Sequence, residues 1–80
     1  MAHVLSLRDD YTGDDLRGLA RSTDSAKQAR RLLALSLIYD GSPRSEAARH
    51  GGVGVQTVRD WVLRFNASGA DGLLDRTSPG

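Results

Sequence analysis

A glycine-rich segment, Gly51-Gly52-Val53, separates two stretches in which small and apolar residues recur at helical spacing. The stretch before it opens at Ser42-Pro43 and carries Ala47-Ala48, and the stretch after it runs from about Val55 to Ala67. Because proline suits the first position of a helix and glycine suits its end, we expect Ser42 as the cap, Pro43 as the first helical residue, and Gly51-Gly52 as the stop. The pattern predicts two short helices joined by a tight turn.

Such a pair forms a helix-turn-helix when certain residue types occupy certain positions. Ala48 is small enough for the second helix to cross closely, and Gly52, four positions later, tolerates a positive φ. The second helix also needs apolar residues that face the core. The structural core residues that we expect for this unit are Ala48, Val53, Val58, Trp61 and Phe65. These fitting positions in one register predict a helix-turn-helix.

The sequence upstream predicts two further helices. Thr12 precedes an expected helix over 13–21, and an uninterrupted run with apolar residues at spacings of three and four predicts a longer helix over 25–39. The fold class that follows is all-α, a compact, homeodomain-like bundle of about four helices. The expected organisation is an N-terminal arm over 1–11, a DNA-binding domain over 12–75, and the start of a linker over 76–80.

Charge is distributed unevenly along the chain, although the net charge is only +1. Residues 1–24 carry a net −2, residues 25–64 a net +4, and residues 65–80 a net −1. A basic middle segment is a plausible electrostatic footprint for phosphate, but solvated helix faces give the same distribution. The charge pattern therefore supports a nucleic-acid partner only together with the helix-turn-helix.

In a helix-turn-helix the second helix is the recognition helix, and its N-terminal half enters the major groove. The outward residues of that half are the expected base contacts: Gln56, Thr57 and Arg59. The expected phosphate contacts are Arg44, Arg49 and Arg64. Each of these side chains is alternatively an ordinary exposed residue, and Thr57 is alternatively a helix cap. We expect Asp60 to pair with Arg64 at the next turn, and Trp61 to belong to the core.

Several classes of site are not indicated by the sequence. There is no cysteine for a disulfide or a thiolate metal site, and neither His3 nor His50 has a partner at metal-ligand spacing. No glycine-rich loop carries a phosphate-binding lysine, and the apolar run over 32–39 is too short to span a bilayer. We expect no catalytic residue, cofactor, metal, membrane or small-molecule substrate, and a cytoplasmic location. The oligomeric state is left open.

A set of motifs extends beyond the turn itself. They are Ala47-Ala48-Arg49, Gly51-Gly52, Gln56-Thr57-Val58-Arg59-Asp60-Trp61-Val62, Arg64-Phe65-Asn66, Gly69, Asp71-Gly72-Leu73-Leu74-Asp75-Arg76 and Ser78-Pro79-Gly80. With these motifs the chain resembles the N-terminal helix-turn-helix of bacterial insertion-sequence transposases of the mariner-like group. The segments over 5–11 and 29–35 resemble the first helices of the same family, so the resemblance covers nearly the whole chain.

The resemblance implies a domain that binds the terminal inverted repeats of a transposon during transposition. It also implies a separate catalytic domain with a metal-binding acidic triad, which these 80 residues do not contain. Gly54 and Val55 stand where the family is expected to have more polar residues. Two other functions stay open, a stand-alone transcription regulator and a helical protein–protein adaptor. A regulator that reads two half-sites needs a dimer, and no coiled-coil heptads are present to supply one.

Overall fold

The computed structural model describes residues 6–74, and the regular structure in this range is helical throughout. In chain order the elements are α1 (Gly13–Ser22), α2 (Ala26–Tyr39), α3 (Arg44–Gly51), α4 (Val55–Ser68) and the 3₁₀ helix η1 (Gly69–Leu73). The all-α class, the four α-helices and the helix-turn-helix made by α3 and α4 are confirmed. The residues expected to form the linker, 76–80, lie outside the described range.

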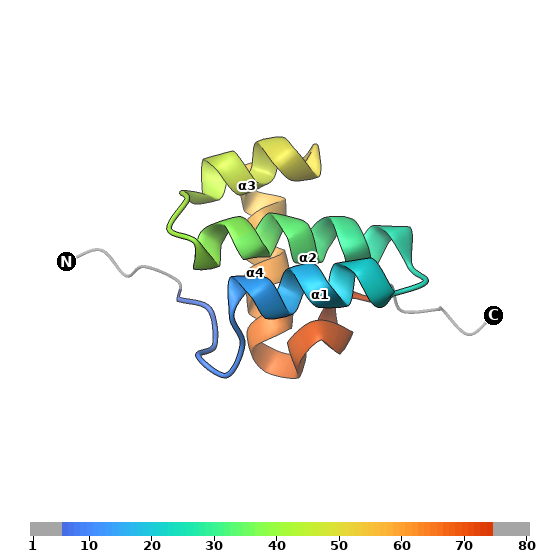
Figure 1. Cartoon of the computed structure of the whole chain (residues 1–80). Helices are drawn as coiled ribbons and strands as arrows, with labels where there is room; N and C mark the ends of the chain where they lie inside the picture. The colour runs from blue at the N-terminus through green and yellow to red at the C-terminus, as the bar shows by residue number, and fades with distance from the viewer. Residues whose placement is uncertain (1–5, 75–80) are drawn as a thin grey trace.

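The helices are arranged around α2. Helices α1 and α3 lie on either side of it, and α4 crosses behind it at a steep angle (Figure 1). Helix η1 folds back on the end of α4 and also touches α2. Within the described residues, no helix is both long and apolar enough to cross a membrane.

The starts of α1 and α2 are fixed by the side chains that the sequence indicates. Thr12 Oγ1 accepts a hydrogen bond of 3.1 Å from the backbone N–H of Asp15, and the Asp15 carboxylate accepts one of 2.9 Å from the N–H of Thr12. This reciprocal pair is a capping box. Ser25 Oγ accepts from the Gln28 N–H at 3.0 Å, so Ser25 is the cap of α2 rather than its first residue.

The expected start of α3 is wrong by one residue. Pro43 is the N-cap, with an extended backbone at φ −72° and ψ 160°, and Ser42 lies outside the helix without capping it. The Pro43 carbonyl accepts from the N–H groups of Glu46 and Ala47 at 3.0 and 3.3 Å. The fixed φ of proline is compatible with both the cap and the first helical position, so the pattern alone does not separate them.

One hydrophobic core draws on all five elements. Its buried members are Leu16, Leu32, Ala34, Leu35, Ala47, Ala48, Val58, Trp61, Val62, Phe65 and Leu73. Val53, in the turn, is partly buried and packs against this cluster. The face of α4 that joins the core is thereby fixed, and the opposite face is left to solvent.

Residues 6–11 pack against the C-terminal end of α4. The N–H of Arg8 donates to Asn66 Oδ1 at 2.8 Å, and Asn66 Nδ2 donates to the Ser6 carbonyl at 2.8 Å. The rings of Tyr11 and Phe65 lie 4.9 Å apart. This part of the expected arm therefore contributes to the packing of the domain, at the end of α4 remote from the turn. Residues 1–5 lie outside the described range.

Candidate DNA-binding interface

The turn between α3 and α4 is made by residues 52–54. Gly52 has φ +69° and ψ 31°, the left-handed conformation that favours glycine, and the Val53 N–H donates to the Ala48 carbonyl at 3.0 Å. A Cβ at Gly51 would lie 3.0 Å from Cζ3 of Trp61, so the ring of α4 rests directly on the last turn of α3. The sequence indicates that the second helix crosses the first closely at Ala48. In the structure Gly51 is a further position where α4 approaches α3 closely.

Helix α4 has a clearly divided surface. Val58, Trp61, Val62 and Phe65 are buried. The three expected base contacts, Gln56, Thr57 and Arg59, are all exposed in the first two turns. At about 3.6 residues per turn, Gln56 lies near the centre of the exposed face, while Thr57 and Arg59 lie on opposite flanks of it.

Two apolar side chains interrupt this exposed face. Val55 and Leu63 are 46% and 47% exposed. Gly54 is the N-cap of α4 and provides no side-chain acceptor, and within the described residues the Thr57 hydroxyl caps nothing. The first amides of the helix therefore point outward without a side-chain partner, which suits an approaching acceptor or anion.

The three arginines expected at phosphates differ in their surroundings. Arg44 is half-buried on α3 and makes no ion pair with any residue in the described range. Arg49 is exposed and donates to both carboxylate oxygens of Glu46, at 2.6 Å to Oε1. This hydrogen bond lowers the pKa of Glu46 and raises the pKa of Arg49. Arg49 is thus already held by a neighbour on its own helix.

Arg64 is engaged in a different way from that expected. Its Nη2 donates to the carbonyl of Leu74 at 2.8 Å, which ties α4 to the end of η1. The expected Arg64 pair with Asp60 is wrong, since no such ion pair forms between these two described residues. The reason is that η1 turns back along α4 and brings a carbonyl within reach of the guanidinium.

A group of basic residues beside the turn was not singled out from the sequence. Lys27, Arg30 and Arg31 on α2 line a hollow of about 140 Å³ together with Gly51, Val53 and Trp61. Arg31 Nη1 donates to the Leu73 carbonyl at 3.0 Å, and its Cζ lies 5.7 Å from the centre of the Trp61 ring. The signal in the sequence is three cations at i, i+3 and i+4 in the first half of the helix that precedes the helix-turn-helix.

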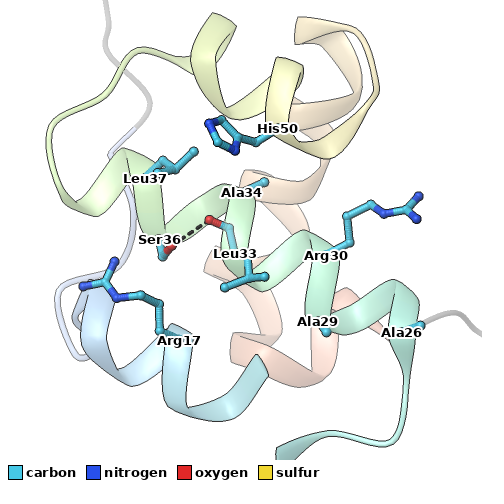
Figure 2. Close-up of a pocket in the computed structure, with 9 residues that line it drawn as sticks. All are labelled: Arg17, Ala26, Ala29, Arg30, Leu33, Ala34, Ser36, Leu37 and His50. Atoms are coloured by element: carbon cyan, nitrogen blue, oxygen red, sulfur yellow. Dashed lines mark hydrogen bonds between the residues drawn. The ribbon is translucent and has the colours of Figure 1, made fainter. Parts of the chain in front are cut away.

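A second, larger hollow of about 560 Å³ crosses α2 between α1 and α3. Figure 2 shows its mainly apolar floor, with Ala29, Leu33 and Leu37 on α2, and the basic side chains of Arg17 and Arg30 at its margins. No cluster of histidine, aspartate and glutamate that suits a metal ion occurs within residues 6–74. The lining of the hollow is mainly apolar, and its polar members are Arg17, Arg30, Ser36 and His50.

Comparison with known proteins agrees with this geometry. The family described as "Winged helix-turn helix" matches residues 31–80. The chain is 62% identical over 80 residues to "Uncharacterized protein y4pG/y4sC" of Sinorhizobium fredii (strain NBRC 101917 / NGR234). The alignment covers 100% of this chain and 42% of that protein. No solved structure matches significantly.

The match includes α3, the turn and α4, and a helix-turn-helix implies binding to DNA. Within residues 6–74 no β-strand follows α4, and η1 takes the position directly after this helix. The chain belongs to the winged helix-turn-helix family.

Proposed function

We propose that this domain binds double-stranded DNA sequence-specifically, with the N-terminal half of α4 in the major groove. The observation that carries the proposal is the divided surface of α4. Its inner face packs closely on α3, where the Trp61 ring contacts Gly51. At its start Gln56, Thr57 and Arg59 are exposed. A recognition helix requires this combination of a rigid backing and polar side chains that reach base edges.

Each exposed residue has a defined role in this proposal. Gln56 bonds bidentately to adenine and Arg59 to guanine, because their side chains present paired groups that match those bases. Thr57, on the other flank, contacts a phosphate or a thymine methyl group. The exposed side chains of Val55 and Leu63 add apolar surface for thymine methyl groups.

The phosphate contacts come from α3 and from the later part of α4. Arg44 is available without breaking an ion pair in the described range. Arg49 exchanges Glu46 for a phosphate, and this exchange is easy because an ion pair exposed to water stabilises the fold only weakly. Arg64 would make its contact with guanidinium donors not used by the Leu74 carbonyl.

The DNA that we propose as the target is the terminal inverted repeat of a transposon. The support is the resemblance of the run from Ala48 to Pro79 to transposase helix-turn-helix modules. In this proposal the chain is the DNA-recognition part of a transposase and acts in the bacterial cytoplasm, where the nucleoid lies. The 62%-identical protein, of which this chain spans 42%, has length for a further domain.

Duplex binding is tested first with a fluorescently labelled duplex at several salt concentrations. A single module with four to six phosphate contacts should show a slope of log affinity against log salt of roughly −4 to −5. Absence of binding at low salt would contradict the proposal and favour a protein–protein adaptor.

Sequence recognition is tested by competition between the terminal repeat and a scrambled duplex. Gln56→Ala and Arg59→Ala should each reduce the preference for the repeat by about 1–3 kcal/mol. Arg44→Ala and Arg49→Ala should weaken both duplexes alike and reduce the salt slope by about one. Loss of preference in Arg49→Ala but not in Gln56→Ala and Arg59→Ala would show that α4 is not the recognition helix.

A further inference from the structure

We infer that the basic hollow beside the α3–α4 turn is a second binding site for a DNA backbone phosphate, in which Lys27 and Arg30 of α2 hold the anion. The inference rests on the proposed function, because DNA is the ligand. It adds α2 to a surface that otherwise consists of α3 and α4. The hollow is distinct from the contacts of Arg44 and Arg49, which lie on α3.

The lining of the hollow is basic, which suits an anion. Three of its six residues are cationic, namely Lys27, Arg30 and Arg31, and none is acidic. Spacings of three and four place these cations on one face of α2. Like charges held so close together raise the local positive potential, which an anion at the mouth of the hollow would lower.

The hollow lies beside the flank of α4 on which Thr57 is exposed. Trp61 forms one wall, and Thr57 and Arg64 lie four residues before and three residues after it on α4. These three residues therefore form one stripe along α4, on the flank that faces the hollow. A strand that borders the major groove on this flank passes Thr57 and then meets the cations of α2.

One wall of the hollow is held in place by contacts of Arg31. Arg31 is held by the Leu73 carbonyl at 3.0 Å and by the Trp61 ring, so it forms a fixed basic wall. Lys27 and Arg30 are exposed at the surface. Figure 2 shows Arg30 extending away from the apolar residues of the neighbouring hollow. The long side chain of Arg30 can fold over a phosphate, while the position of Arg31 stays fixed by its contacts with Leu73 and Trp61.

The test compares salt slopes for duplex binding by the wild type, Arg30→Ala, and the double variant Lys27→Ala/Arg30→Ala. Arg21→Ala is the matched control, since it removes an equal charge from an exposed position on α1 outside the hollow. Each lost phosphate contact should make the slope shallower by about 0.9. Because Lys27 and Arg30 hold one phosphate, the double variant should show this full change and Arg30→Ala a large part of it. Arg30→Lys should keep the wild-type slope, because lysine also binds phosphate as a point charge.

The inference is overturned if Arg30→Ala and the double variant keep the slope of Arg21→Ala while Arg44→Ala shows a shallower slope. In that outcome DNA binding stands and the hollow plays no part in it. If the wild type itself shows no salt-dependent duplex binding, both this inference and the proposed function fail. Thermal melts of all variants check folding, and Arg30→Ala alone decides the question if the double variant is unfolded.

Discussion

Replacement of Trp61 by alanine tests whether the division of α4 into two faces is correct. Trp61 is 5% exposed, its ring rests on Gly51, and the guanidinium of Arg31 lies over the ring. Truncation of a buried tryptophan typically lowers the free energy of unfolding by about 3–5 kcal/mol. At roughly 0.05–0.15 kcal/mol per residue, a domain of this size has only about 4–12 kcal/mol in total. The variant should therefore be mostly unfolded or melt far below the wild type.

The assay is thermal unfolding followed by circular dichroism. For a domain of this size each kcal/mol shifts the melting temperature by about 4–8 °C, so Trp61→Ala should melt more than about 10 °C below the wild type. Leu63→Ala is the control on the same helix, since Leu63 is 47% exposed and should change stability by less than about 0.5 kcal/mol. Arg59→Ala should also remain folded. Equal melting of the Trp61 and Leu63 variants would refute the assigned facing of α4.

Three further perturbations test the packing around this unit. Gly72→Ala should destabilise the domain by about 1–3 kcal/mol, because its Cβ would lie 2.3 Å from the carbonyl oxygen of Arg64. The Cβ of Gly54→Ala meets open space, so this variant should lose less than about 1 kcal/mol, through the poorer N-cap of α4. Chemical denaturation measures both losses. Tyr11→Ala should lower stability by about 2 kcal/mol through loss of its ring contact with α4, and a melting temperature equal to that of the wild type would show that residues 6–11 are not docked. Burial raises the pKa of Tyr39 from 10.0 to about 12, so its neutral form stabilises the fold below pH 10 and this contribution is lost as the pH rises from about 10 through 12. Denaturation across that range should show a smaller loss for Tyr39→Phe than for the wild type, and equal losses would contradict the burial of this hydroxyl.

The fold was largely accessible from the sequence because its determinants are local. The helical period of α2, the cap at Thr12 and the left-handed glycine at Gly52 each act within one or two turns. A helix-turn-helix is specified by a few positions in one register, so a short window of sequence predicts it. The helix ends differed from expectation by one residue or so, as at Pro43, where two neighbouring positions satisfy the same rule.

The features that the sequence did not reveal depend on contacts between distant segments. The docking of residues 6–11 joins Arg8 to Asn66, and no local pattern indicates a partner 58 residues away. Arg64 was expected to bind within its own helix, but the fold of η1 supplies a backbone carbonyl instead. The Glu46–Arg49 pair is different, since its spacing of three residues on one helix is a local signal that the sequence itself contains.

The central claim is that DNA contacts the exposed start of α4, and titration of the isotopically labelled domain with a short duplex by nuclear magnetic resonance tests it most directly. The account predicts that the amide signals that shift most belong to Gly54, Gln56, Thr57 and Arg59, with smaller shifts along α3. The shifts should diminish as salt is added, because phosphate contacts release counterions. Shifts concentrated on α1 and residues 6–11, with the start of α4 unchanged at low salt, would contradict the account.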